Sequence, residues 1–216
     1  MTIRLASPDA RALEAFCRGQ LKWDATLPTR VLTTSRALGV FTAPPLGVLV
    51  FVAVPADGLE EPVDTTVSLA ALADALRDHP DDLRLDGLTR AVIPPAPAPS
   101  LNHLPPTDGW QLPIGAMSGD LVPLVEAATR EFSGRAAGSP PRQQQEVAEE
   151  IWSRPGFGGL PIRALHAARQ LGMLPADASR VAAATSGQWR RLSTSRGQVF
   201  SYASGPAARL ALQLVR

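Results

Sequence analysis

The sequence predicts an α+β protein of two lobes, each built from a helix followed by an antiparallel β-meander. Helical and then strand-like patterns follow one another near both ends of the chain, and a proline-rich stretch lies between them. The two ends also share a short internal similarity. We expect an N-terminal α+β lobe over residues 1–93, a proline-rich linker or strap over residues 94–109, and a C-terminal lobe over residues 110–216 that combines a helical segment with a basic hairpin or meander.

The N-terminal lobe begins with a predicted helix. Ser7 is a suitable N-cap, Pro8 suits the first helical position, and an apolar stripe continues to about Gln20. The chain that follows is rich in β-branched and aromatic residues, which favour strands. Strands are expected over residues 30–35, 39–43 and 47–54.

The remainder of this lobe combines a second helix with extended chain. The helix is expected from about Leu69 to Arg77, with Thr66 or Ser68 as its cap, and residues 83–93 predict a strand. The next segment, IPPAPAPSLNHLPPTDG, favours extended, polyproline-like conformations. Such a segment is typical of a linker between lobes or of a strap across a surface.

The C-terminal lobe is predicted as a short strand, a series of helices and a hairpin. The strand covers residues 110–114, the hairpin covers residues 189–204, and alternating leucines favour a final strand over residues 207–215. The helices are expected over residues 118–132, 141–152, 162–172 and 177–185.

Two pairs of segments resemble each other across the chain. RALEAFCRGQL (residues 11–21) is similar to RALHAARQLGML (residues 163–174), and TSRALGVFTAPP (residues 34–45) is similar to TSRGQVFSYASGP (residues 194–206). The order of the matches is the same in both halves. They are consistent with an internal duplication of a helix-plus-meander unit.

Charge is unevenly distributed along a chain whose formal net charge is +1. From Ile151 onward there are nine arginines and one acidic residue, whereas residues 1–150 carry 12 basic and 19 acidic residues. This asymmetry predicts either an acidic partner for the basic C-terminal segment or mutual neutralisation of the two parts of the chain. Lys22 is the only lysine, a bias that we interpret as the codon composition of a GC-rich bacterium.

Cysteine content and hydropathy bear on location. Cys17 is the only cysteine, so no intramolecular disulfide is possible, which fits a reducing compartment. The N-terminus lacks the apolar core of a signal peptide, and no apolar run approaches the ~20 residues of a spanning helix. We therefore expect a cytoplasmic protein with no membrane partner.

The predicted hairpin is the first candidate site. Trp189 and Arg191 share one face of its first strand, and an even-numbered turn places Tyr202 on the same face. Aromatic rings near a guanidinium can stack on bases, while Arg190 and Arg196 can meet phosphates or an acidic partner. The alternative interpretation is a core face of aromatic rings across which Arg191 extends toward solvent.

The glycine-rich turn before the helix at residue 162 is a second candidate. The backbone of Gly158 and Gly159, with the guanidinium of Arg163, can present donors to a small anion. The sequence matches neither the dinucleotide-binding pattern nor the phosphate loop with its lysine. A turn between two helices also requires glycine.

Catalytic signatures are weak. The three histidines, His79, His103 and His166, lie far apart in the sequence, and no histidine and cysteine spacing predicts a metal site, so we name no metal and no cofactor. We expect a non-enzymatic interaction protein with a basic C-terminal lobe that binds a protein partner or forms a homodimer. The alternatives are a nucleic-acid-binding accessory protein that uses the hairpin, and a small-anion-binding enzyme at residues 156–163.

Overall fold

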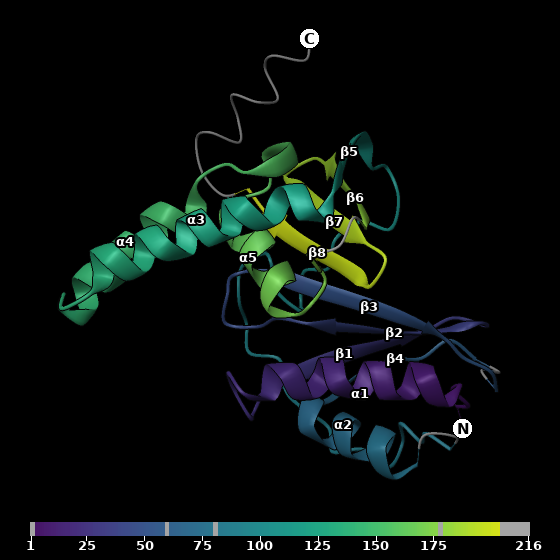
Figure 1. The fold of residues 1–216 in the computed structure, drawn as a ribbon. Helices are drawn as coiled ribbons and strands as arrows, with labels where there is room; N and C mark the ends of the chain where they lie inside the picture. The colour runs from purple at the N-terminus through teal and green to yellow at the C-terminus, as the bar shows by residue number, and fades with distance from the viewer. Residues whose placement is uncertain (1–2, 59–60, 80–81, 177–178, 204–216) are drawn as a thin grey trace. The chain divides into compact units, whose positions relative to one another are not determined.

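A computed structural model describes residues 3–58, 61–79, 82–176 and 179–203 of the chain. The chain divides into two compact units, an N-terminal unit of residues 1–104 and a C-terminal unit of residues 105–216. Each described unit contains helices and one antiparallel set of four strands, so the prediction of an α+β protein with two helix-plus-meander lobes is confirmed (Figure 1).

The sheet of the N-terminal unit has the strand order β4-β1-β2-β3. Its strands are β1 (Pro28–Thr33), β2 (Ala37–Thr42), β3 (Leu49–Pro55) and β4 (Asp64–Ser68). The first three form the predicted meander, with Val31 opposite Val40 and Val40 opposite Val52. Strand β4 was not predicted; it pairs with β1 and places Thr65 opposite Val31.

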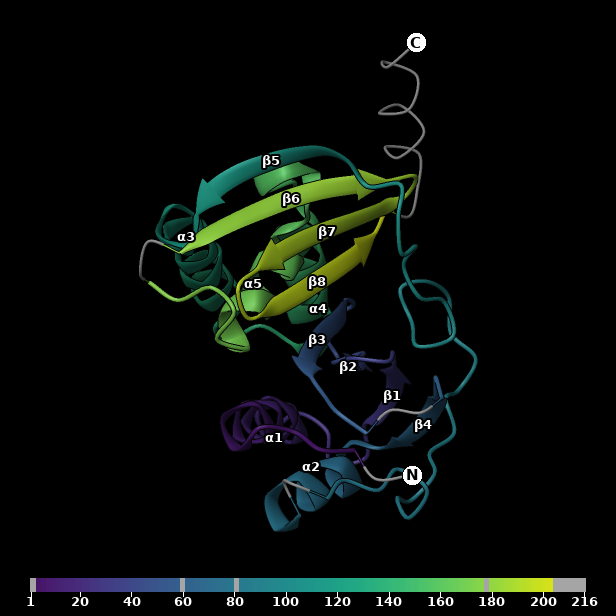
Figure 2. The ribbon, with the colours of Figure 1, turned by 90° about the vertical axis from the view of Figure 1, so that its right-hand side faces the viewer.

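Helices α1 (Ser7–Leu21) and α2 (Leu69–Asp78) pack against each other on one face of this sheet (Figures 1 and 2). Ser68 caps α2 as predicted, because its hydroxyl accepts a hydrogen bond from the Ala71 backbone N–H. The N-cap of α1 is Ala6 rather than Ser7, and no side chain caps this helix; Pro8 lies in its first turn. The apolar faces of both helices meet the sheet in one core, which includes Leu13, Cys17, Val31, Val40, Val67, Leu72 and Leu76.

The predicted strand over residues 83–93 is wrong. Leu83 forms an isolated bridge with Ile3, Arg90 forms one with Val67, and the chain between them turns at Asp86 and Gly87. The apolar side chains in this region therefore do not alternate along a continuous strand. Leu83 and Leu85 instead fill the core beside the helices.

The sheet of the C-terminal unit has the strand order β5-β6-β7-β8, with all neighbours antiparallel. Its strands are β5 (Gln111–Met117), β6 (Arg180–Ser186), β7 (Trp189–Thr194) and β8 (Gly197–Tyr202). Strands β5 and β7–β8 lie where the sequence predicted a short strand and a hairpin. Strand β6 lies where it predicted a helix.

That predicted helix, residues 177–185, is wrong over its described part. Alanine favours helices in isolation, but Ala182 and Ala183 pair with β5 on one side and with β7 on the other, and Ala184 pairs with β7. Tertiary pairing therefore overrides helix propensity here. The predicted final strand, residues 207–215, lies outside the described residues.

The helices of the C-terminal unit are α3 (Ser118–Ala136), α4 (Pro141–Ser153) and α5 (Ile162–Gln170), and a single 3-10 turn, η1 (Phe157–Gly159), precedes α5. They cover one face of the β5–β8 sheet, and the opposite face is turned toward the viewer in Figure 2. Side chains of Ala183, Leu192 and Val199 lie buried on the covered face.

The two units contain the same parts in a different sequence order. In each, one strand runs directly into a helix (β4 into α2, β5 into α3) and pairs with the first strand of a three-stranded meander. This strand-helix pair follows the meander in the N-terminal unit and precedes it in the C-terminal unit. Helices α1 and α5, which carry the similar segments 11–21 and 163–174, both precede a meander.

The second pair of similar segments falls on different turns of the two meanders. Thr34–Arg36 joins the first and second strands, whereas Thr194–Arg196 joins the second and third. In both turns the threonine hydroxyl accepts a hydrogen bond from the arginine backbone N–H. The similar sequences therefore form the same type of turn, which lies at a different position in each meander.

Candidate functional site

In the hairpin β7–β8, Trp189, Arg191 and Tyr202 share one face of the sheet, as predicted. Trp189 lies opposite Tyr202, and Arg191 lies opposite Phe200. The rings of Trp189 and Tyr202 are nearly perpendicular, with centroids 5.1 Å apart. Both side chains are half-buried, and strand alternation places them on the face opposite to that of Leu192 and Val199, which the helices leave uncovered.

Arg191 is held inside the C-terminal unit by Trp110. The carbon atom at the centre of its guanidinium lies 4.3 Å from the centroid of the Trp110 ring, and the Trp110 and Phe200 centroids are 5.8 Å apart. Burial lowers the pKa of Arg191, and no described residue accepts a hydrogen bond from its Nε. Arg191 thus packs on an aromatic face.

Arg190 and Arg196 do not join that cluster. Arg190 points to the opposite face of β7, where its guanidinium donates to the carbonyls of Gly187 and Trp189 and burial lowers its pKa. Arg196 lies in the β7–β8 turn and donates to the carbonyl of Gly172. A six-residue strand is roughly 20 Å long, so Arg196 and the Trp189–Tyr202 pair lie at opposite ends of the hairpin.

Arg196 does have an exposed basic neighbour at its own end of the sheet. Arg180 begins β6, and the register of β6 with β7 places it beyond Ser193, toward the same turn. Both side chains are exposed, and neither forms an ion pair with any residue that the structure describes. Within the described part of the chain, these two arginines, rather than the predicted three, form an exposed basic surface at this end of the sheet.

The glycine-rich turn is explained by packing. Gly158 has φ of +60°, and a Cβ at this position would overlap the Cβ of Ala183 on β6. The Gly156 N–H donates to the Leu160 carbonyl, and Arg163 donates to the Glu149 carboxylate at 2.6 Å. The guanidinium of Arg163 and the N–H of Gly156 are therefore engaged within the unit.

Ion pairs within the C-terminal unit neutralise part of its positive charge. Arg154 bridges Glu131 of α3 and Glu150 of α4, and Arg135 contacts the same two carboxylates. Hydrogen bonds from Arg154 and then Arg135 lower the pKa of Glu131 to about 2, and bonds from Arg135 and then Arg154 lower that of Glu150 to about 2. The neutralising acids belong to the same unit as the arginines.

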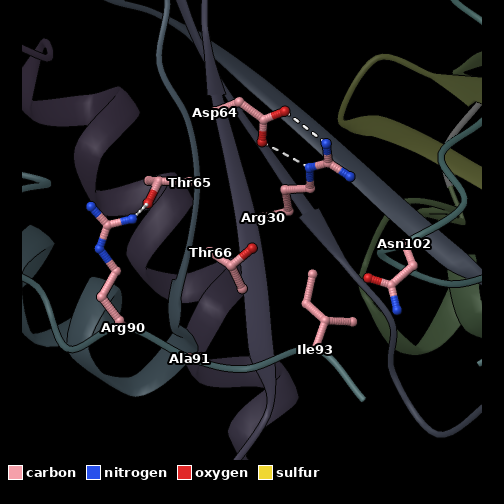
Figure 3. A pocket seen from close by; sticks show the side chains of 8 residues that line it. All are labelled: Arg30, Asp64, Thr65, Thr66, Arg90, Ala91, Ile93 and Asn102. Atoms are coloured by element: carbon pink, nitrogen blue, oxygen red, sulfur yellow. Dashed lines mark hydrogen bonds and ion pairs between the residues drawn. The ribbon is translucent and has the colours of Figure 1, made fainter. Parts of the chain in front are cut away.

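A pocket of about 490 Å³ lies in the N-terminal unit, between strands β1 and β4 and the chain that leads into the proline-rich segment (Figure 3). It is an open, shallow hollow. Its lining residues are Arg30, Asp64, Thr65, Thr66, Arg90, Ala91, Ile93 and Asn102.

The polar residues of this pocket are largely paired with one another. Arg30 donates to both oxygens of Asp64, at 2.8 and 2.7 Å, and to the carbonyl of Leu101 at 2.9 Å. Arg90 donates to the hydroxyl of Thr65 at 2.6 Å. The hydrogen bond from Arg30 lowers the pKa of Asp64, so this carboxylate is ionised and held. The hydrogen bonds of Arg30 and Arg90 thus attach residues 90–101 to strands β1 and β4.

This pocket was not predicted, because the residues that line it come from four separate segments of the chain. Arg30 and Asp64 are 34 residues apart and become neighbours only through the pairing of β1 with β4, where Leu32 lies opposite Asp64. The strand β4 itself was not predicted. No local motif marks these residues.

The histidines do not converge on a catalytic site. His79 caps the C-terminus of α2, His103 is hydrogen-bonded through Nδ1 to Ser100 at 3.1 Å, and His166 packs on Trp152 with centroids 4.4 Å apart. Desolvation lowers the pKa of His166. Among the described residues there is no group of three or more histidine, cysteine or acidic side chains arranged to hold a metal ion. The described helices also include none that is both long and apolar enough to cross a bilayer.

Both parts of the chain match families of undefined role. Residues 1–94 match the family described as Domain of unknown function (DUF8010), and residues 105–206 match the family described as Domain of unknown function (DUF8185). No curated protein matches the chain.

Solved structures show a clear similarity in fold. The chain is similar to the DNA polymerase III subunit beta of Pseudomonas aeruginosa, with a TM-score of 0.60 and 12% identity over 98% of this chain and 68% of that one. It is also similar to pol III beta of Caulobacter crescentus (TM-score 0.59, 14% identity, 95% and 66% coverage) and to the beta subunit of Thermotoga maritima (TM-score 0.56, 10% identity, 97% and 67% coverage). Its fold resembles that of DNA polymerase sliding clamps.

The chain spans about two thirds of the length of these clamp subunits. At 10–14% identity the similarity concerns the fold alone. The two α+β units of this chain, with equivalent parts, are consistent with the predicted internal duplication.

Proposed function

We propose that this chain is a non-enzymatic, cytosolic interaction protein with a clamp-like fold that associates with DNA and with protein partners. The observation that carries this proposal is the extent of the fold similarity, which covers 95–98% of the chain and includes both units. The similar proteins are a DNA polymerase subunit and sliding clamps by name. In this proposal residues 94–109 act as the linker or strap between the two predicted lobes.

The side chains support a binding role more than a catalytic one. Asp64 is the acidic residue of the described pocket, and it is committed to Arg30. None of the three histidines lines this pocket. Catalysis by general acid and base needs titratable groups that converge on a reacting atom, and the described residues offer no such convergence.

A second candidate is direct contact of the hairpin region with nucleic acid. It is favoured by the two exposed arginines, Arg180 and Arg196, at one end of the β5–β8 sheet. The predicted contribution of Arg190 and Arg191 is weaker, since both guanidinium groups are partly buried within the unit. Anion binding by the turn at Gly158, Gly159 and Arg163 stays a prediction. The close packing of Gly158 and the ion pair between Arg163 and Glu149 do not favour it.

The test is a titration of the full chain against mixed-sequence single-stranded and double-stranded oligonucleotides over a range of salt. We expect binding at low salt. The logarithm of the binding constant should then fall linearly with the logarithm of the salt concentration, because arginines that bind phosphates release counterions. The double variant Arg180→Ala, Arg196→Ala is compared with the double variant Arg84→Ala, Arg142→Ala, which removes the same charge from exposed positions elsewhere.

The outcomes separate the two candidates. If DNA binding persists in both variants, the clamp-like association acts through another surface. If only Arg180→Ala, Arg196→Ala lowers the salt slope, by up to about 2, the hairpin end is the DNA contact. If the wild-type chain does not bind DNA even at low salt, the DNA role is wrong and protein partners alone remain.

A further inference from the structure

The four-stranded sheet of the C-terminal unit has one face without helices, which we call the open face (Figure 2). Leu192 and Val199 lie on the covered face, so the residues next to them in β7 and β8 lie on the open face. The register of β5 and β6 continues this face across the sheet. Its larger solvent-accessible side chains are Met117, Arg180, Trp189, Arg191, Gln198 and Tyr202.

The open face is accessible to solvent along its length. In the described part of the chain, Ala184 and Phe200 are its only buried residues. Met117 and Arg180 are exposed, and the other large side chains are half-buried. Antiparallel sheets often leave one face to water, and that face is normally polar. Here the solvated face also carries large aromatic side chains, which is typical of a binding surface.

The charge of the open face is positive. The four strands contain three arginines and no acidic residue. Arg180 and Arg191 lie on the open face and form no ion pair with a described residue, whereas Arg190 lies on the covered face. Arg196 donates to the carbonyl of Gly172 at the end of α5, so it also points toward the helices. A positive surface without acids attracts phosphates.

The aromatic side chains of the open face lie at one end of the hairpin. The ring planes of Trp189 and Tyr202 meet at 77°. Since one ring presents its edge to the other, neither face of that edge-on ring is covered by its partner. In the middle of the hairpin, the guanidinium of Arg191 lies over the ring of Trp110. Aromatic ring faces beside arginines are the groups on which single-strand-binding proteins stack bases.

The basic and aromatic ends of the open face are joined by polar side chains. Strand β6 extends from Arg180 to Ser186, which lies opposite Trp189, so the two ends are roughly 20 Å apart. Ser193 lies opposite Gln198 between these ends, and both are half-buried. Serine and glutamine side chains commonly hydrogen-bond to phosphate and sugar oxygens. The face therefore offers a phosphate contact, a polar middle and an aromatic end.

We propose that the open face binds single-stranded DNA, with bases stacked on Trp189 and Tyr202 and a phosphate bound by Arg180. Base faces are available in a single strand, whereas in a duplex they are stacked on one another. A broad sheet also does not enter the major groove, which admits a helix or a two-stranded ribbon. The inference rests on the proposed association with DNA, and it adds the form of the DNA and the surface that binds it.

The first measurement is fluorescence anisotropy of the full chain with labelled oligo(dT) of about 12 nucleotides, compared with the duplex of the same oligonucleotide and oligo(dA). Both titrations use the same salt concentration. We expect the single strand to bind at least about tenfold more tightly than the duplex, because only its bases are free to stack.

Trp189→Leu removes the ring but keeps an apolar side chain. It should weaken binding of oligo(dT) by about 5- to 150-fold, the effect of losing one stack between a base and an aromatic ring. Trp189→Phe keeps a ring face and should retain most of the affinity. The matched control is Trp23→Leu, which changes an indole that is 36% exposed in the N-terminal unit and should leave the affinity unchanged.

The salt dependence separates the phosphate contact from the stacked bases. Arg180→Ala should reduce the slope of the logarithm of the binding constant against the logarithm of salt concentration by about 0.7, the value for one phosphate contact in a single strand. Trp189→Leu should lower the binding constant equally at every salt concentration, since stacking releases no counterion. Arg84→Ala, which removes an exposed arginine of the N-terminal unit, is the matched control and should leave the slope unchanged.

The inference and the proposed DNA association can fail separately. If the chain binds single strand and duplex equally well, if Trp189→Leu binds oligo(dT) like the wild type, or if Trp189→Phe loses as much affinity as Trp189→Leu, the open face does not stack bases and the inference is overturned, while the DNA association stands. If the wild type binds neither oligonucleotide even at low salt, both fail. A preference for the single strand that Trp189→Leu abolishes and Trp189→Phe keeps is the expected result.

Discussion

The guanidinium of Arg191, on β7, lies over the ring of Trp110, which immediately precedes β5, with 4.3 Å from the guanidinium carbon to the ring centroid. The indole Nε1 of Trp110 donates to the Pro106 carbonyl at 3.0 Å. Trp110 thus ties the start of the C-terminal unit to the uncovered face of its sheet. Arg191 therefore contributes to the stability of this unit.

Arg191→Ala should lower the free energy of unfolding by about 1–2 kcal/mol, because it removes a partly desolvated cation-π contact and the packing of its aliphatic stem. Urea denaturation monitored by tryptophan fluorescence measures the change. Arg196→Ala, in the exposed turn, should change stability by less than about 0.5 kcal/mol. Equal effects of the two variants would contradict a structural role that is specific to Arg191.

Gly158 is the tightest position of the turn before α5. Gly158→Ala should destabilise the chain by about 2–4 kcal/mol, because φ of +60° disfavours a side chain and the new methyl group would overlap the side chain of Ala183. Gly138→Ala is the matched control: its φ is +71°, but no atom lies within 4 Å of the added Cβ. It should show only the backbone cost, about 1 kcal/mol.

The same pair of residues offers a rescue. In Gly158→Ala, Ala183→Gly the overlap is removed while the backbone strain remains, so thermal unfolding should return part of the way to the wild type. If added phosphate or sulfate raises the melting temperature of the wild type but not of Gly158→Ala, the turn binds an anion after all. We expect no such difference.

Local signals in the sequence predict the helices of this fold better than its sheets. Pro8, Ser68 and Pro141 mark the starts of three helices, and α1, α2 and α4 lie close to their predicted positions. Strand β6 was not predictable in the same way. Its alanine-rich run Val181–Ala184 favours a helix in isolation and becomes a strand because β5 and β7 lie on its two sides.

The candidate sites show the same limit. The period of two along a strand correctly placed Trp189, Arg191 and Tyr202 on one face of the hairpin. It did not reveal that the guanidinium of Arg191 stacks on the ring of Trp110, which lies 81 residues earlier in the chain. Pattern along one strand specifies which residues share a face, but the identity of what covers that face depends on distant segments.

The bidentate pair of Arg30 and Asp64 joins β1 to β4 and, through the Leu101 carbonyl, to the proline-rich segment. Asp64→Asn should lower the free energy of unfolding by about 1 kcal/mol, a modest value because both groups are partly exposed to solvent. It should also accelerate proteolytic cleavage between residues 94 and 104. Asp82→Asn, which removes a weaker partner of the exposed Arg84, is the control and should leave the cleavage rate unchanged.

The four-residue network of Glu131, Arg135, Glu150 and Arg154 makes the C-terminal unit sensitive to acid. Both glutamates have a folded pKa of about 2, below their ordinary value of 4.5, so their contribution is complete above pH 4.5 and is lost as the pH falls toward 2. The urea midpoint should therefore decrease between pH 5.5 and pH 3. Arg154→Met removes the arginine shared by both glutamates, and it should reduce this pH dependence more than Arg142→Met, which removes one exposed pair within α4. Identical pH profiles for the two variants would show that the network adds nothing beyond isolated surface pairs.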